Sequence, residues 1–320
     1  MNFSIKHCLL ILKHHNPFRS MVRLYLFNLY LLITFIFCNY IKIYRHKIIY
    51  DNKQKIISND ILVYAVHMSN EILPAYIIEN ANFFIKERYQ PIFVITFSNG
   101  LNFKHIVKNI SNQFSGARIF VRKNYGKDFG SFKDVLSIIE NKNSINKIIL
   151  QNDSLIGPLY PSNFYRDLLD IKADIKGITE SYDHLYHLQS SFILVNNKHA
   201  INCLFNFFKN YAVFNSRIFI VLFGEIGLTQ FFLSKGMKVK PLVSVLNALS
   251  CSPDKSSLNI SLNTQHHFAS ELFLEFDIPF IKRELLTKNP SKAQIKYNEI
   301  LRKIGKSKYF LLESALMDRN

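Results

Sequence analysis

The strongest candidate for chemistry in this sequence is the short polar stretch Asn152-Asp153-Ser154. It follows the apolar residues 148–150 after a single glutamine, Gln151, and Gly157-Pro158 turns the chain soon afterwards. In an open α/β sheet, ligands bind outside the carboxyl ends of the strands, where a carboxylate such as Asp153 can hold a cation or face a phosphate group. The same residue types also favour turns and helix caps. Taken alone, the stretch is compatible with either a binding site or a structural turn.

Polar side chains follow the other predicted strands in the same way. His67 follows a strand predicted over residues 61–66, and Ser98 follows a strand predicted over 91–97. Because parallel strands end at one edge of a sheet, we expect these side chains to converge with those around Asp153.

A third cluster follows a strand predicted over residues 117–121 and runs from Asn124 to Gly130. Gly126 permits a close backbone approach or a positive φ. Asp128 can accept hydrogen bonds from a base or ribose, and Lys127 can meet a phosphate. The alternative is a plain loop in which Asp128 only caps the next helix, which is predicted from about residue 131.

Glu225 is the candidate general base. The sequence predicts a helix over residues 224–235 that begins near this glutamate. A first-turn carboxylate is stabilised by the helix dipole, which is a purely structural explanation. The same carboxylate, if it faces a sugar hydroxyl, can remove its proton.

The order of the predicted elements indicates an α/β fold. Continuously apolar strands alternate with helical stretches, which is typical of a mostly parallel central sheet flanked by helices. We expect one catalytic-type domain over residues 58–290 and a C-terminal helical extension over 291–320. No GxGxxG or P-loop pattern is present to cradle a nucleotide in those familiar ways.

The charge of the chain points to an anionic partner. The 320 residues carry a formal net charge of +17, and the four cysteines show no metal-binding or disulfide spacing. Nucleic acid, an acidic membrane and phosphate-bearing substrates all fit such a charge. No helix-turn-helix, RRM or OB pattern is present, so we expect no nucleic-acid partner.

Residues 1–57 form a basic segment around an apolar stretch at 24–44. This stretch is predicted to be a hydrophobic helix that associates with a membrane, either at the interface or as a single pass. The alternative is a buried helix of the globular domain.

The chain resembles the rhamnan synthesis protein F family of bacterial polysaccharide glycosyltransferase-like proteins. The resemblance rests on four short segments in order: Asn124-Tyr125-Gly126-Lys127-Asp128; Leu150-Gln151-Asn152-Asp153-Ser154 with Gly157-Pro158; Gly177-Ile178-Thr179-Glu180-Ser181 leading to His187-Leu188-Gln189-Ser190-Ser191-Phe192; and Ile278-Pro279-Phe280-Ile281-Lys282-Arg283-Glu284-Leu285-Leu286.

This resemblance implies a GT-A-like glycosyltransferase. A nucleoside diphosphate sugar would donate its sugar, with inversion, to a cell-surface polysaccharide or lipid-linked glycan. The expected roles are donor binding by His67, Asn124, Gly126, Lys127, Asp128, Asn152 and Ser154; metal binding by Asp153, with Mg²⁺ or Mn²⁺; proton removal by Glu225; and shaping of the sugar or acceptor pocket by Glu180, His187 and Gln189.

The resemblance also implies a location and leaves a second function open. The basic N-terminal segment would hold the enzyme on the cytoplasmic side of the bacterial inner membrane, where such donors and acceptors meet. Each acidic motif has one carboxylate where the glycosyltransferase class usually has two. The alternative function is therefore a non-catalytic GT-A-like module that binds a glycan or partner in a polysaccharide assembly complex.

Overall fold

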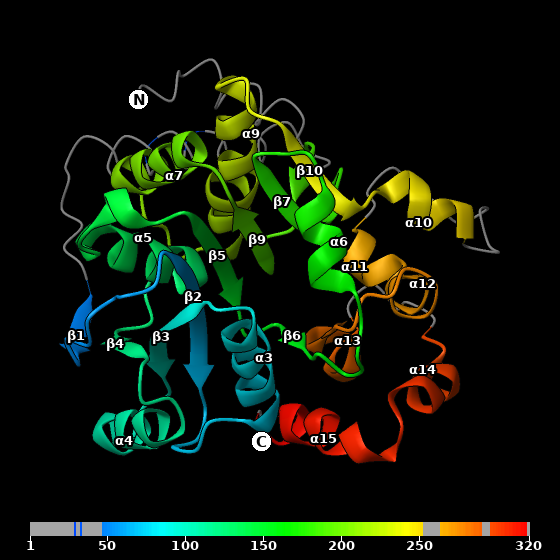
Figure 1. Ribbon diagram of the computed structural model, residues 1–320, viewed down its shortest axis with the longest axis horizontal. Helices are drawn as coiled ribbons and strands as arrows, with labels where there is room; N and C mark the ends of the chain where they lie inside the picture. Colours follow the sequence, from blue (N-terminus) through cyan, green and yellow to red (C-terminus); the bar gives the residue numbers. More distant parts are fainter. Residues whose placement is uncertain (1–28, 30–32, 34–46, 252–262, 290–294, 319–320) are drawn as a thin grey trace.

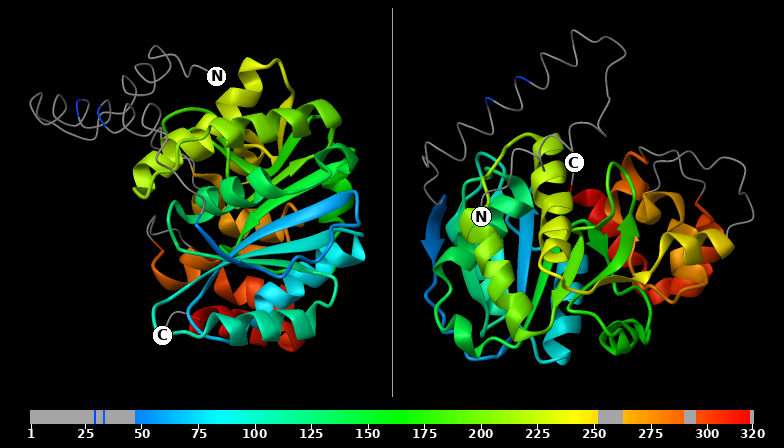
Figure 2. Two further views of the ribbon diagram at one scale, coloured as in Figure 1. Left: turned by 90° about the vertical axis from the view of Figure 1, so that its left-hand side faces the viewer. Right: turned by 90° about the horizontal axis from the view of Figure 1, so that it is seen from above.

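The protein is described by a computed structural model, shown in Figure 1, that covers residues 47–251, 263–289 and 295–318 together with Leu29 and Ile33. Apart from Leu29 and Ile33, the hydrophobic helix predicted at the N-terminus lies outside the described residues. The described chain forms one large sheet with helices on both faces, as Figures 1 and 2 show, which confirms the predicted α/β class.

The sheet has nine strands in the order β1-β4-β3-β2-β5-β9-β7-β10, with β8 paired to β7. The strands are β1 Ile48–Asp51, β2 Asp60–Met68, β3 Gln90–Phe97, β4 Arg118–Arg122, β5 Lys147–Asn152, β7 Ile175–Ser181, β8 His187–Leu188, β9 Phe192–Val195 and β10 Val239–Val243.

The strand directions make the sheet mostly parallel. Strands β4, β3, β2 and β5 are parallel neighbours. Strand β9 is antiparallel to both β5 and β7, so β7 and its parallel neighbour β10 run the same way as β5. A second, two-stranded sheet pairs β6 Leu155–Ile156 with β11 Ile281–Lys282 in antiparallel register. The antiparallel direction of β9 was not predicted, because a buried strand shows the same apolar run in either direction.

Each face of the sheet is covered by its own helices and core. On β2, the alternating side chains of Leu62, Tyr64 and Val66 belong to one cluster, and those of Ile61 and Val63 belong to the other. The first face carries α3 Ala75–Lys86, α4 Phe103–Gln113, α6 Phe164–Asp170 and α12 Ala269–Leu274; the second carries α5 Lys127–Ile138, α7 Lys198–Asn210 and the helical segment 217–234.

The segment 217–234 consists of α8 Arg217–Phe219, the π-helical turn η2 Ile220–Ile226 and α9 Gly227–Ser234. It starts earlier than the sequence predicted, so Glu225 lies inside a helix and not in its first turn. Among the described residues it is also the one helix long and apolar enough to cross a membrane, yet 61% of it is buried within the protein. Its apolar character is explained by burial against the sheet.

The C-terminal helices return to the first face of the sheet. After α10 Val245–Cys251, α11 Thr264–His267 and α13 Arg283–Thr287 come α14 Tyr297–Ile304, the turn η3 Lys306–Lys308 and α15 Tyr309–Met317. Ile300, Ile304, Leu311 and Ala315 belong to the same core as α3. The predicted C-terminal extension is therefore packed into the fold, and Figure 1 shows α15 beside α3.

Candidate functional site

The strand order places a switch point beside Asp153. From β2 the chain first adds β3 and β4 on one side, and then returns to add β5 on the other side of β2. In sheets of this kind the crevice for a ligand lies at the carboxyl ends of the two strands where the order reverses. These ends carry His67 on β2, Asn152 on β5 and Asp153 just after β5, so all three predicted residues lie at the expected edge.

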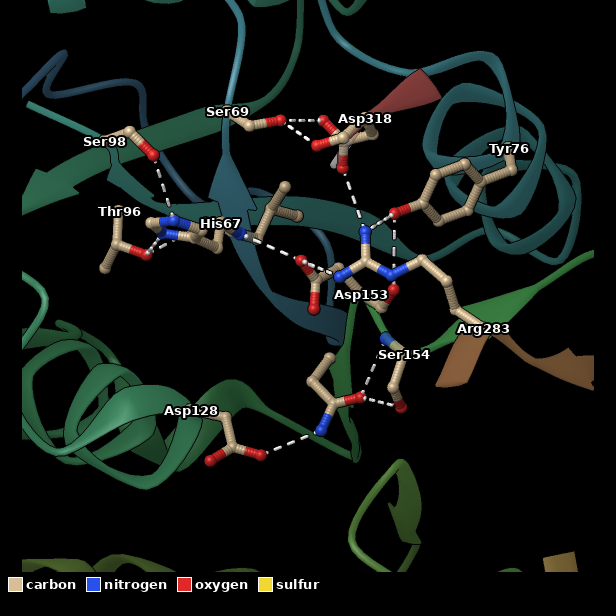
Figure 3. Close-up of polar contacts among 12 residues, drawn as sticks. His67, Ser69, Tyr76, Thr96, Ser98, Asp128, Asp153, Ser154, Arg283 and Asp318 are labelled. Carbon is tan, nitrogen blue, oxygen red and sulfur yellow. Dashed lines mark hydrogen bonds and ion pairs between the residues drawn. The ribbon is translucent and has the colours of Figure 1, made fainter. Parts of the chain in front are cut away.

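Asp153 is anchored across this switch point. The backbone N–H of His67 donates to its Oδ2 at 3.1 Å, and Nη2 of Arg283 donates to the same oxygen at 3.3 Å. Asn152 caps the turn, since its Oδ1 accepts hydrogen bonds from the backbone N–H of Ser154 at 3.1 Å and from the hydroxyl of Ser154. The stretch is both a turn and an anchored carboxylate, and Figure 3 shows the whole arrangement.

The His67 ring is held by two hydroxyl groups at the end of the neighbouring strand β3, one on the strand and one just after it. Its Nδ1 lies 3.0 Å from the Thr96 hydroxyl, and its Nε2 lies 3.4 Å from the Ser98 hydroxyl. With both ring nitrogens engaged, His67 contributes a fixed ring and a backbone donor to the site.

Arg283 is the central cation of the site. It is 8% exposed, and its Nη1 donates to Asp318 Oδ2 at 2.9 Å and to the Tyr76 hydroxyl at 2.5 Å. Asp318 is also tied to the end of β2, because the Ser69 hydroxyl donates to its Oδ1 at 2.7 Å. Elements from opposite ends of the chain thus clamp one guanidinium next to Asp153.

The loop before α5 brings Asp128 to the same edge. Gly126 has φ +78°, and a Cβ there would lie 2.2 Å from the Val213 side chain, so the loop requires glycine at this position. The helix begins at Lys127, four residues earlier than predicted, which puts Asp128 in its first turn. Asn152 Nδ2 donates to Asp128 Oδ2 at 2.8 Å and links the loop to the end of β5.

The carboxyl of Asp128 lies among other acids. Burial raises its pKa, and the Glu225 and Asp153 carboxylates raise it further, while the hydrogen bond from Asn152 opposes them. Its neighbours on the loop differ from it: the side chains of Asn124 and Lys127 are exposed to solvent.

Glu225 lies at the same edge, in the π-helical turn. The backbone N–H of Ser190 donates to Glu225 Oε1 at 2.7 Å, and the carbonyl of Ser191 accepts from the Asn152 backbone N–H at 3.3 Å. Glu225 and Asn152 therefore bind the backbone of two residues that are adjacent in sequence, Ser190 and Ser191. Single π-turns inside helices are frequent at functional sites.

Three further predicted residues are buried in an internal network and not gathered around Asp153. Glu180 Oε1 accepts from the Val245 N–H, and burial raises the pKa of its carboxyl. Gln189 Oε1 accepts from the Thr179 hydroxyl at 2.6 Å, and His187 Nδ1 lies 2.7 Å from the Leu185 carbonyl. These contacts order the β7–β8 hairpin next to the site.

The groups around Asp153 are not a suitable set of ligands for a resident divalent ion. One carboxylate oxygen is occupied by the His67 N–H and by Arg283, and the described residues contain no group of three His, Cys, Asp or Glu side chains arranged to hold a metal. Arg283 Nη2 lies 3.3 Å from Asp153 Oδ2, so a metal bound to this oxygen would face a guanidinium and not a further anionic ligand.

Sequence reasoning assigned no role to Arg283, Lys282, Tyr76, Ser69 or Asp318. Lys282 and Arg283 could have been noticed in the sequence, because they form a basic pair inside the segment 278–286 that carries the family resemblance. For Asp318 no local pattern exists; its role arises only when α15 packs beside α3.

The comparisons with known proteins place the chain in a family. It matches the family described as Rhamnan synthesis protein F over residues 94–313, more than half of its length. The chain belongs to this family, as its short motifs indicated. It is also similar to virulence protein VirA of Vibrio anguillarum, strain ATCC 68554 / 775, with 26% identity over 212 residues, which is 59% of this chain and 68% of VirA. A second VirA sequence of the species gives the same values.

Proposed function

We propose that the protein is a glycosyltransferase of polysaccharide biosynthesis, of GT-A type, that transfers a sugar from a nucleoside diphosphate sugar to a glycan or lipid-linked acceptor. Family membership supports the general role. The observation that carries the proposal is the convergence of Asp128, Asp153 and Glu225 on the carboxyl edge of the sheet, at the switch point between β2 and β5.

In this proposal the donor lies across the strand ends. The loop 124–128 and the turn at Asn152-Ser154 hold the nucleotide and its diphosphate. Glu225 removes the proton of the acceptor hydroxyl, which then attacks the sugar from the side opposite the diphosphate and inverts the configuration. Its Oε1 is fixed by Ser190, and within the described residues its Oε2 has no hydrogen-bond partner, so that oxygen is available to accept a proton.

The pocket residues have a more limited part in this proposal. Glu180, His187 and Gln189 are satisfied by internal hydrogen bonds, so they shape the acceptor side through the hairpin that they order. Mg²⁺ and Mn²⁺ have no step in this mechanism, because the groups around Asp153 are not a suitable set of ligands for a resident ion.

The test is release of nucleoside diphosphate by the purified full-length protein from a panel of sugar donors. Turnover with one donor, lost in Glu225→Gln, supports the proposal. Turnover that survives in both Glu225→Gln and Asp153→Asn contradicts the mechanism.

The second candidate is a non-catalytic GT-A-like module that binds a glycan or partner. The ion pair between Asp153 and Arg283 favours it, since a neutralised carboxylate is less available for chemistry. Donor binding without turnover across the same panel supports this candidate.

We further propose that residues 24–44 associate with the cytoplasmic face of the inner membrane. The basic residues around this stretch support electrostatic attraction to anionic lipids. Sedimentation of the full chain with vesicles of anionic and neutral lipids tests this, and equal recovery in the supernatant with both contradicts it.

A further inference from the structure

Within the part of the chain that the structure describes, Lys282 is a cation without a hydrogen-bonding partner at the edge of the site. It is half-buried, and its ammonium makes no hydrogen bond or ion pair with any residue that the structure describes. Burial lowers its pKa, while the carboxylates of Glu225, Glu284 and Asp128 within electrostatic reach act in the opposite direction. A partly desolvated ammonium is costly unless an anion compensates it.

The position of Lys282 follows from its strand. In the β11–β6 pair, Lys282 lies opposite Leu155, the residue directly after the Asn152-Asp153-Ser154 turn. The next backbone N–H, that of Arg283, donates to the Ser154 carbonyl at 2.7 Å. The segment is thus fixed against the turn by its backbone and cannot easily drift away from it.

Lys282 and Arg283 serve different sides of this turn. Lys282 is the last residue of β11 and Arg283 is the first residue of α13, and their side chains reach different groups. Arg283 reaches Asp153 and Asp318, whereas Lys282 is within electrostatic reach of Asp128 and Glu225. Figure 3 shows Arg283 beside Asp153, on the side of the turn away from Asp128. A donor diphosphate lying over the Asp128 and Glu225 side of the turn would therefore approach Lys282.

We propose that Lys282 neutralises the diphosphate of the sugar donor, and that Arg283 cancels the charge of Asp153, so that donor binding needs no resident divalent ion. This inference rests on the proposed function.

The group transfer then balances without a metal. The bond between the sugar carbon and the diphosphate oxygen breaks, and its electron pair stays on that oxygen. The acceptor oxygen forms the new bond and its proton passes to Glu225. The Lys282 ammonium meets the charge that develops on the leaving diphosphate, which is the electrostatic contribution that such sites require.

The experiment is calorimetric titration of the full chain with UDP, GDP, dTDP and inorganic pyrophosphate, in EDTA and in Mg²⁺. We expect one nucleoside diphosphate to bind in EDTA about as tightly as in Mg²⁺. Lys282→Met should weaken that binding roughly tenfold to a hundredfold, as for loss of a charged hydrogen bond. Lys282→Arg keeps the charge and should retain most of the affinity.

Lys288→Met is the matched control, because Lys288 is an exposed lysine at the end of α13, the short helix that directly follows Lys282. It should bind as the wild type does. Thermal unfolding of each variant checks folding, and Lys282→Gln repeats the measurement if the methionine variant does not unfold cooperatively.

The outcomes separate the two proposals. Binding that requires Mg²⁺ and is unchanged in Lys282→Met overturns this inference and leaves the glycosyltransferase proposal standing. Absence of nucleoside diphosphate binding in both buffers overturns the proposed function, and the role of Lys282 with it.

Discussion

Arg283 forms an ion pair with Asp153, with 3.3 Å between Nη2 and Oδ2, across the turn that ends β5. The two residues are 130 positions apart in sequence. Asp153, the strongest candidate for chemistry in the sequence, therefore has a positively charged neighbour within the protein itself. The electrostatics of the edge are therefore set by a group of charges and not by one acidic residue.

Asp318 holds the other side of the same guanidinium, and its removal should destabilise the fold. Asp318 is 4% exposed and Arg283 8% exposed. Removing one partner of a buried ion pair costs about 3–5 kcal/mol when the remaining charge is left uncompensated. Because Asp153 still pairs with Arg283, Asp318→Ala should lower the free energy of unfolding in urea by less, about 1–3 kcal/mol, the cost of leaving a buried polar group unsatisfied.

The control for this measurement is an exposed pair. Arg166 and Asp167 are 3.9 Å apart, with side chains 70% and 49% exposed. Asp167→Ala should change the free energy of unfolding by less than about 1 kcal/mol. Equal effects of the two substitutions would contradict the clamping role of Asp318.

Glu225 provides a prediction about turnover. Glu225→Gln keeps the size of the side chain and an oxygen that can accept from the Ser190 N–H, but it cannot take a proton. We expect turnover to fall roughly 10²- to 10⁴-fold, the usual contribution of a general base, with donor binding retained. Kinetics with the donor found by screening, together with calorimetry, separate the two effects.

Glu140→Gln is the control for Glu225, because Glu140 is exposed at the end of the α5 region. It should leave turnover unchanged. A Glu225 variant that loses donor binding and turnover to the same degree would indicate a structural glutamate and not a base.

Asp128 predicts a pH dependence of stability. Burial and nearby carboxylates raise the pKa of this acid in the folded state, so its protonated form is favoured by folding. The stability it contributes is present below the unfolded pKa of about 3.9 and is lost as pH rises through the folded value. Asp128→Asn should therefore gain stability relative to the wild type between pH 4 and neutral pH.

Urea unfolding of both proteins across this pH range measures that difference. The hydrogen bond from Asn152 is altered in the variant at every pH, so only the slope of the difference is diagnostic. If the difference in free energy of unfolding stays constant with pH, or falls as pH rises, the neighbouring carboxylates do not raise the pKa of Asp128.

Replacing Gly126 by alanine should cost more stability than replacing Gly100 by alanine. At Gly126 the chain has φ +78° and a Cβ would lie 2.2 Å from Val213 Cγ1, whereas at Gly100 the φ is +91° with nothing within 4 Å. Gly100→Ala should cost about 1–2 kcal/mol from backbone conformation alone. Gly126→Ala adds a clash with a stiff branched side chain and should cost more, measured by urea unfolding.

If the two alanine variants are equally stable, the loop before α5 rearranges freely. The same measurement therefore reports whether the loop that carries Asp128 is rigid. A rigid loop is what the proposed donor site needs, because positioning depends on a fixed backbone.

Much of the fold could be predicted from the sequence, and the reason is local. The strands β2, β3 and β5 are short apolar runs ended by polar residues, and these runs carry the signal of buried strands. His67, Asp128 and Asp153 were found for the same reason, since each one lies at the end of a predicted strand or in the loop after it. The start of α5 was misplaced because Gly126 and Lys127 both adopt positive φ, which sequence patterns do not reveal at a lysine.

The remainder of the site could not be predicted, because it depends on contacts between distant segments. Glu225 was expected at a helix start, but the apolar residues before it continue the helix and bury it against the sheet. Arg283 meets Tyr76 and Asp318 only after three separate elements have packed. Nothing near Asp318 in sequence indicates a buried carboxylate.

The clamp on Arg283 also has a consequence for biosynthesis. The ribosome makes Ser69 and Tyr76 early and Asp318 last among them, so a nascent chain can build most of the sheet while the guanidinium still lacks one of its two acids. The edge acquires its final charge arrangement only after α15 emerges and docks.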